Sequence, residues 1–149
     1  MNSREDNPNR DEIRLSGSDL TLASAIRVAC SFPGTRVSLT SESRDAVGRS
    51  RAYVEELLAG PDQIYGVTTG FGRLAEVVIP PDQREALQKN LVRSHCAGVG
   101  ASLSREEVRI IMLLRANSLA RGHSGIRVEV VERILDFLNL GIHPRVPEA

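Results

Sequence analysis

The stretch IYGVTTGFGR occupies residues 64–73 and is the most informative local signal in the chain. Its three glycines are Gly66, Gly70 and Gly72. Glycine has no Cβ atom and adopts backbone angles that other residues avoid, so this stretch suits neither a helix interior nor a strand interior. We therefore expect a mobile loop that presents the hydroxyl group of Tyr65, with Phe71 close by. The plainer interpretation is a turn between a short strand at residues 63–67 and the next helix.

Two longer blocks follow this loop. The block LQKNLVRSHCAGVG covers residues 87–100, and the block RANSLARGHSGIR covers residues 115–127. Together with the loop, they closely resemble the aromatic amino acid ammonia-lyases and aminomutases, in the family's order and at similar spacing. The resemblance runs from roughly Ile13 to Glu148. It implies the N-terminal segment of the ammonia-lyase fold, which leads into a helical bundle.

The resemblance assigns a catalytic role to Tyr65. It implies that the tyrosine hydroxyl is the base that removes a β-proton from an aromatic amino acid, and that a glycine-flanked loop closes over the substrate. The loop residues implied with it are Gly66, Gly70, Phe71 and Gly72. The alternative is a tyrosine that only anchors a turn.

A second candidate position is the pair Ser94-His95. This pair resembles the histidine ammonia-lyases and also some tyrosine aminomutases, whereas phenylalanine-type lyases usually carry more apolar residues here. The resemblance implies that both side chains bind the substrate and favours histidine. By composition alone, a histidine next to Leu91 on a helix face indicates a half-buried packing residue.

Asn117 and a possible metal site complete the candidates. Asparagine is a mediocre helix former, so Asn117 in the middle of a helix suggests an amide that holds active-site backbone in place; the alternative is a solvent-facing polar residue. A metal site would need His95, Cys96 and His123. Adjacent residues of a helix point to different sides, so we expect no metal site.

The chemistry of the family also requires an electrophile, methylidene-imidazolone, which forms from an internal Ala-Ser-Gly. No Ala-Ser-Gly occurs in the sequence: Ala101-Ser102 is followed by Leu103, and Ser124-Gly125 is preceded by His123. In the family, that tripeptide comes just after a sequence like residues 146–148. We therefore expect residues 13–149 to be the N-terminal part of an ammonia-lyase-like domain that is inactive alone. The partner would be a C-terminal polypeptide or further copies in a tetramer, and the alternative is a non-catalytic remnant or interaction module.

Composition excludes several other classes. The 149-residue chain has a formal net charge of zero, which indicates neither a nucleic-acid partner nor a membrane partner. Its two cysteines form no disulfide framework, and the N-terminus has no apolar signal segment, so a cytoplasmic location is expected. The glycines of the loop do not match a phosphate-binding motif.

The remaining patterns predict a mainly helical chain with a few short N-terminal strands. Residues 1–12 are expected to be a disordered tail. Strands are predicted around residues 13–15 and 37–39. Helices are expected from Thr21 to Pro33, over 41–59, after a capping pair Asp82/Glu85, from Ser104 to Gly122 and from Val128 to Gly141.

Apolar stripes indicate which helix faces are buried. We expect the two late stripes to pack in a larger bundle, and we expect the arginines to lie on a solvated face. The stripes are Leu22-Ala25-Ile26-Ala29, Val47-Val54-Leu57-Leu58, Val108-Ile111-Met112-Leu119 and Val128-Val131-Leu135-Leu138.

Overall fold

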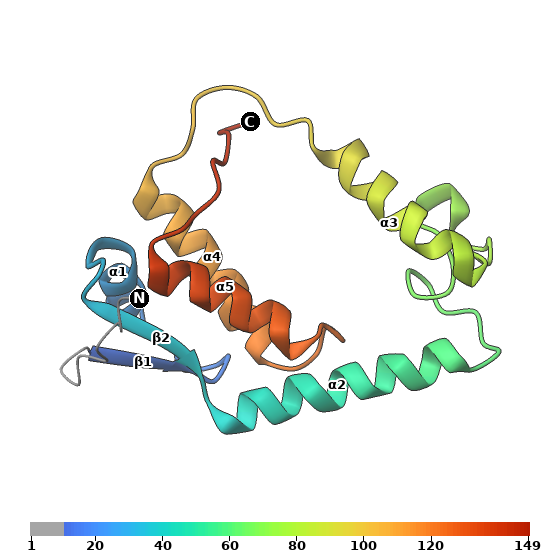
Figure 1. The fold of residues 1–149 in the computed structure, drawn as a ribbon, viewed down its shortest axis with the longest axis horizontal. Coiled ribbons are helices and arrows are strands. Elements are labelled where there is room, and N and C mark those ends of the chain that lie inside the picture. Colours follow the sequence, from blue (N-terminus) through green and yellow to red (C-terminus); the bar gives the residue numbers. More distant parts are fainter. Residues whose placement is uncertain (1–10) are drawn as a thin grey trace, which may run out of the picture.

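Helices dominate the computed structural model, which describes residues 11–149 (Figure 1). The mainly helical class with two short N-terminal strands, predicted from the sequence, is confirmed. The elements in chain order are β1 (Asp11–Leu15), α1 (Leu22–Cys30), β2 (Thr35–Leu39), α2 (Ser41–Ala59), the 3₁₀ turn η1 (Gly72–Leu74), α3 (Pro81–His95), α4 (Arg105–Ala120) and α5 (Val128–Leu140).

Strand β1 begins earlier than predicted. It pairs in parallel with β2 along its whole length, and this pairing includes Asp11 and Glu12. The predicted tail limit at residue 12 is therefore wrong, and residues 1–10 lie outside the described residues. Side chains add to the pairing: Arg27 forms an ion pair with Asp11 at 2.5 Å, and the hydroxyl of Ser38 donates to a carboxylate oxygen of Glu12 at 2.9 Å.

The free edge of β2 is covered by a side chain of α5. The Nδ2 of Asn139 donates to the carbonyl of Val37 at 2.8 Å, and its Oδ1 accepts from the Val37 backbone N–H at 2.8 Å. One amide thus satisfies both backbone groups of Val37 on that side. Leu15 and Leu39 bury their side chains beside it in the core.

The core lies where α1, α4 and α5 pack together and against β2 (Figure 1). The two late stripes, expected to pack in a larger bundle, supply much of this chain's own core, although Ile111 is 48% exposed. The buried apolar residues are Leu15, Ala25, Val28, Ala29, Val37, Leu39, Val47, Val108, Met112, Leu113, Ala116, Leu119, Ala120, Val131, Leu135 and Leu138.

Helix α1 buries a different face from the one predicted. Leu22 and Ile26 are 77% and 50% exposed, whereas Val28 is buried between the expected Ala25 and Ala29. Helix α1 packs against α4. The position of α4 therefore decides which side chains of α1 are buried, and the size of the apolar residues does not.

Arg109 is buried, so the expectation that the arginines are solvated is wrong for this residue. Its Nε and Nη2 donate to the carbonyl of Val28 at 3.1 and 2.8 Å, and its Nη1 donates to the carbonyl of Leu138 at 2.9 Å. Its guanidinium also lies 5.2 Å from the centre of the Phe32 ring. Burial lowers the pKa of Arg109 below its ordinary value. The charge is tolerated because the C-terminal ends of α1 and α5 carry partial negative charge.

Local signals set most helix ends as predicted. Thr21 caps α1, and Ser104 and Glu107 form a reciprocal capping box at the start of α4. Gly141 ends α5 in the left-handed conformation, with φ of 70°. The predicted role of Asp82 is wrong: the N-cap of α3 is Pro80, two residues earlier, and the helix begins at Pro81, whose missing N–H costs nothing in the first turn.

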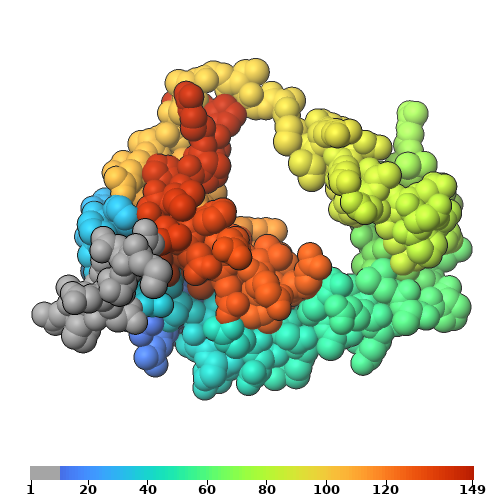
Figure 2. Space-filling view, viewed as in Figure 1, coloured from blue at the N-terminus to red at the C-terminus, as the bar shows by residue number. Residues whose placement is uncertain are grey.

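Residues 60–97, which we call the arm, stand apart from the other described residues, which we call the body. Helix α3 of the arm buries none of its residues, and the extensive packing contacts all join elements of the body. The space-filling view shows an opening between α3 and the helices α4 and α5 (Figure 2). The arm is therefore held mainly at its two ends, by α2 and by the segment that leads into α4.

Candidate functional site

The loop that carries Tyr65 is folded around two buried threonines. The backbone N–H of Ile64 donates to Thr68 Oγ1 at 2.8 Å, and the N–H of Gly66 donates to Thr69 Oγ1 at 3.3 Å. The Thr68 hydroxyl donates in turn to the carbonyl of Asp62 at 3.0 Å. Both threonines are 4% exposed in an arm with little other burial. These two threonines were not predicted from the sequence, although threonine side chains can form hydrogen bonds with neighbouring backbone groups.

The strand predicted at residues 63–67 is absent. These residues form a turn in which the N–H groups of Val67, Thr68 and Thr69 all approach the carbonyl of Ile64, at 3.0, 2.9 and 3.3 Å. Three donors on one carbonyl require a tight bend, which an extended strand cannot supply. A single antiparallel bridge, between Thr69 and Val78, closes the loop.

Tyr65 projects from this turn. Its side chain is 64% exposed, and its ring meets the Phe71 ring edge-on at 6.1 Å between centroids. Gly66 has φ of 70°, and a Cβ atom there would lie 3.0 Å from the Phe71 ring. Glycine is therefore needed both for the bend and for the position of Phe71 beside Tyr65. The arrangement leaves the tyrosine hydroxyl accessible to a substrate.

Ser94 and His95 lie at the C-terminal end of α3, and both are exposed. The Ser94 hydroxyl donates to the carbonyl of Leu91 at 2.8 Å, and His95 Nδ1 lies 3.0 Å from that hydroxyl and 2.9 Å from the same carbonyl. These contacts hold the ring at the end of the helix, with its Nε2 side available. His95 is itself exposed, so it is not the half-buried packing residue that composition alone would indicate.

Asn117 lies in the body, on α4. Its Oδ1 is buried and accepts no hydrogen bond within residues 11–149. A buried acceptor without a donor costs about 1–3 kcal/mol. Within these residues no hydrogen bond joins Tyr65, His95 and Asn117, so the described chain does not bring the candidate residues into one constellation.

Residues 11–149 also show neither a cluster suited to a metal ion nor a membrane-spanning helix. No group of three His, Cys, Asp or Glu side chains between residues 11 and 149 could hold a metal ion. None of the helices in this range has the length and apolar character needed to cross a membrane. The cysteines Cys30 and Cys96 are both exposed and free.

One open groove is lined by none of the candidate residues. It runs along α5, encloses about 540 Å³ and is lined by apolar residues and charged residues of that helix, among them Val130, Arg133 and Phe137. A wall from a single helix does not enclose a ligand, so we assign no binding role to this groove.

The aromatic amino acid lyase family matches residues 20–149 of the chain. The chain belongs to that family. Histidine ammonia-lyase of Chloroflexus aurantiacus is 50% identical over 137 residues, which are 91% of this chain and 26% of the relative. This lyase-family chain thus spans about a quarter of the length of the relatives that it matches.

Solved structures of the aromatic amino acid lyase family agree with the fold. Tyrosine aminomutase from Streptomyces globisporus matches with a TM-score of 0.84 at 38% identity, over 93% of this chain and 26% of that one. Histidine ammonia-lyase from Trypanosoma cruzi matches with a TM-score of 0.84 at 36% identity, over the same shares. The ammonia-lyase fold expected from the sequence is therefore confirmed for this part of the lyase chain.

Proposed function

We propose that this chain supplies the N-terminal part of an ammonia-lyase active site that acts on histidine, with Tyr65 as the base. The observation that carries the proposal is the exposed Tyr65 hydroxyl on a loop fixed by two buried threonines. The 50% identity to a histidine ammonia-lyase supports the substrate.

The exposure of Tyr65 supports its proposed role in proton removal. In the proposed elimination, the β C–H bond of the amino acid breaks and its proton passes to the phenolate oxygen of deprotonated Tyr65, which becomes a hydroxyl group. The electron pair forms the C=C bond, and the C–N bond breaks to release ammonia. A base must reach the substrate proton, and the exposed hydroxyl on a turn allows this reach.

Ser94 and His95 are proposed to bind the substrate side chain. Both are exposed at one helix end, and the contact of His95 Nδ1 with the Leu91 carbonyl favours the tautomer that carries a proton on Nδ1. In that tautomer Nε2 accepts a hydrogen bond. An imidazole N–H of a histidine substrate is a donor that matches it.

The electrophile must come from outside these residues. The two serine-containing pairs that most resemble its precursor both have structural roles: Ser102 pairs with Pro147, and the N–H of Gly125 donates to Ser50 Oγ at 3.0 Å on α2. Neither fits the tripeptide from which methylidene-imidazolone forms. We therefore propose that the chain has no ammonia-lyase activity alone and that a complementary C-terminal polypeptide, or a tetramer that contains one, completes it.

A second candidate is a tyrosine or phenylalanine lyase or aminomutase. The similarity to tyrosine aminomutase from Streptomyces globisporus favours it. A non-catalytic remnant or interaction module is the third possibility.

The test uses a completed enzyme, in which residues 13–149 replace the matching segment of the Chloroflexus aurantiacus relative. Tyr65→Phe removes only the hydroxyl, so kcat should fall by about 10²-fold or more while KM changes much less. Tyr53→Phe is a matched control, because Tyr53 is 61% exposed on α2 and should have no effect. Ultraviolet absorbance of urocanate, cinnamate or coumarate follows turnover and identifies the substrate.

Two outcomes would contradict the proposal. A Tyr65→Phe enzyme with near-normal kcat would make the loop purely structural. An unchanged ratio of histidine to phenylalanine turnover in His95→Phe would remove His95 from substrate selection.

A further inference from the structure

The segment after α3 pairs with the segment after α5. The N–H of Val99 donates to the carbonyl of Ala149 at 2.5 Å, and the N–H of Ala149 donates back to Val99 at 3.3 Å. The N–H of Glu148 donates to Ala101 at 2.9 Å, and the N–H of Leu103 donates to Val146 at 2.8 Å. We call these two segments, residues 98–103 and 146–149, the junction. Figure 1 shows the C-terminal segment running beside the loop that joins α3 to α4.

Within the junction, Gly98 and Pro147 approach each other closely. A Cβ atom on Gly98 would lie 2.4 Å from Pro147 Cγ and 3.3 Å from the carbonyl oxygen of Ala149. Gly98 is not among the glycines with positive φ, so its backbone angles do not demand glycine. Glycine is needed at residue 98 because of the limited space, since any side chain there would displace the ring of Pro147.

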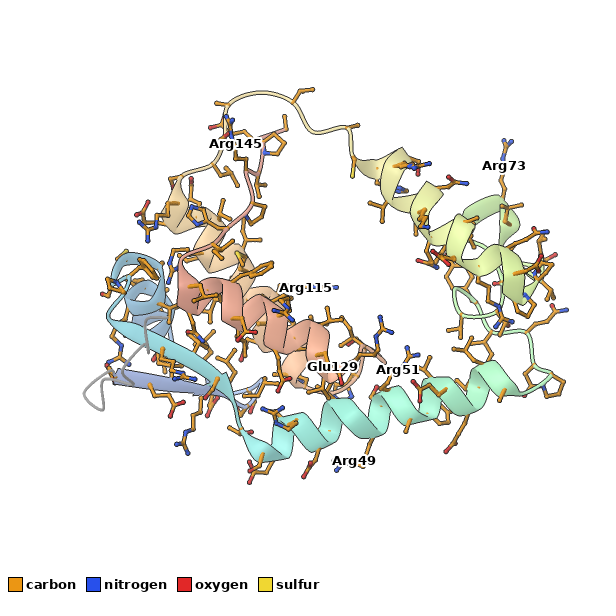
Figure 3. All side chains as sticks on the ribbon, viewed as in Figure 1. Arg49, Arg51, Arg73, Arg115, Glu129 and Arg145 are labelled. Carbon is orange, nitrogen blue, oxygen red and sulfur yellow. The ribbon has the colours of Figure 1, made fainter. Side chains whose placement is uncertain are left out.

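The junction is anchored in the body on one side and continues into the arm on the other. Leu103 and Val146 pack against the core, and Arg145 Nη2 lies 3.4 Å from Ser102 Oγ (Figure 3). Gly98 follows His95 by three residues. Since α3 buries nothing, this contact is the nearest fixed point for the end of the helix that carries Ser94 and His95.

We propose that Gly98 and Pro147 are positioning residues whose contact sets where His95 and Ser94 lie relative to residues 146–149. The inference rests on the proposed function, because it gives these two side chains a substrate to hold. The ring of Pro147 fills the space beside Gly98. The pair acts by fixing the position of the α3 end, and neither residue touches a reacting atom. A displacement of about 1 Å can cost about 10²-fold in rate, so a methyl group here has a large expected effect.

The placement can be measured without catalysis. Cys30 on α1 and Cys96 next to His95 are the two cysteines of the chain, and both are exposed, so spin labels on them report the distance from body to arm. Gly98→Ala should shift or broaden the distance distribution, because the proline ring must move. Pro147→Ala should broaden it as well, because the ring that fills the space is gone. The double variant should narrow it again, because the new methyl group occupies the vacated space.

Catalysis gives the second readout, in the completed enzyme. Gly98→Ala should lower kcat/KM by about 10²-fold, and addition of Pro147→Ala should recover most of it. Loss of a proline by itself lowers stability through the unfolded chain, so a purely destabilising effect of Gly98→Ala would be worsened by the second change. Gly48→Ala is the control, since a Cβ on Gly48 meets nothing within 4 Å.

The outcomes separate the two proposals. If the completed enzyme turns over no amino acid, the proposed function fails. The distances between the spin labels still test whether Gly98 and Pro147 set the position of the α3 end. Distances and kcat/KM that stay unchanged in Gly98→Ala would overturn the positioning role. If Gly98→Ala does not fold, Pro147→Ala alone decides: a narrow, unshifted distance distribution would overturn it.

Discussion

Helix α3 in the arm and helix α4 in the body have nearly the same length, 15 and 16 residues, but opposite burial. Helix α4 buries seven residues, including the charged Arg109, and α3 buries none. The Tyr65 loop and His95 both belong to the arm, so the candidate chemistry lies in the part with the least packing. The difference indicates that the body folds around its own core, whereas the arm is held mainly by its two attachments.

The largest expected difference between body and arm is in the stability lost when a leucine is truncated to alanine. Leu113→Ala removes a completely buried side chain of α4, so we expect a loss of roughly 4 kcal/mol in the free energy of unfolding. Leu91→Ala in α3 makes the same chemical change at a half-buried position and should cost less than about 1 kcal/mol. Urea unfolding followed by circular dichroism measures both. Equal losses would mean that the arm is as well packed as the body.

The buried arginine gives the next effect. Arg109→Ala leaves the carbonyls of Val28 and Leu138 without their guanidinium donors and opens a cavity, so we expect a loss of about 3 kcal/mol. Arg115→Ala on the same helix is the control, since Arg115 is exposed beside the opening, and should change stability by less than about 0.5 kcal/mol (Figure 3). A small loss of stability in Arg109→Ala would show that the C-terminal ends of α1 and α5 do not need the buried guanidinium between them. Urea unfolding again gives the comparison.

A smaller effect distinguishes two glycines that have free space around them. Gly48 lies inside α2, so Gly48→Ala should raise the free energy of unfolding by about 0.5–1 kcal/mol. Gly72 of the arm has φ of 56°, so Gly72→Ala should cost about 1 kcal/mol, and mainly locally. Hydrogen exchange at the amides of Thr68 and Thr69 should become faster in that variant. Slower exchange there would contradict the assigned backbone strain.

The smallest expected effect is on the pH dependence of stability. Hydrogen bonds from the side chain and the backbone N–H of Ser104 hold the pKa of Glu107 below its ordinary value of 4.5. A lowered carboxyl pKa contributes stability that is present above pH 4.5 and is lost as the pH falls through the folded-state pKa. Glu107→Gln keeps an acceptor but does not titrate, so its stability should depend less on pH below about 4.5. Glu106→Gln removes the same charge from the same turn and leaves the capping box intact, and identical pH curves for the two variants would refute the assignment.

The sequence predicted what short-range chemistry decides. The capping box at Ser104, the cap at Thr21 and the limits of α2 depend on neighbours in the chain, and all three are confirmed. The face of α1 could not be predicted, since burial of Val28 over Ile26 depends on where α4 lies. The same holds for Arg109, whose acceptors lie on two other helices.

The candidate site follows the same division. The glycine pattern predicted a loop that exposes Tyr65, but not that Thr68 and Thr69 would fold inward to hold it. The contact between Gly98 and Pro147 joins residues almost fifty positions apart in sequence, so no local pattern could signal it. The roles of Tyr65 and His95 remain predictions that the completed enzyme tests.

The amide of Asn139 also limits how the sheet can grow. A two-stranded parallel sheet has two edges, and an unpaired edge is a template on which strands of other molecules can add. On β2, the Asn139 side chain occupies the donor and the acceptor of Val37 as a third strand would. Addition of a foreign strand there would first have to break both bonds and move a residue of α5. This side chain therefore blocks the addition of a strand at Val37, in the middle of the β2 edge.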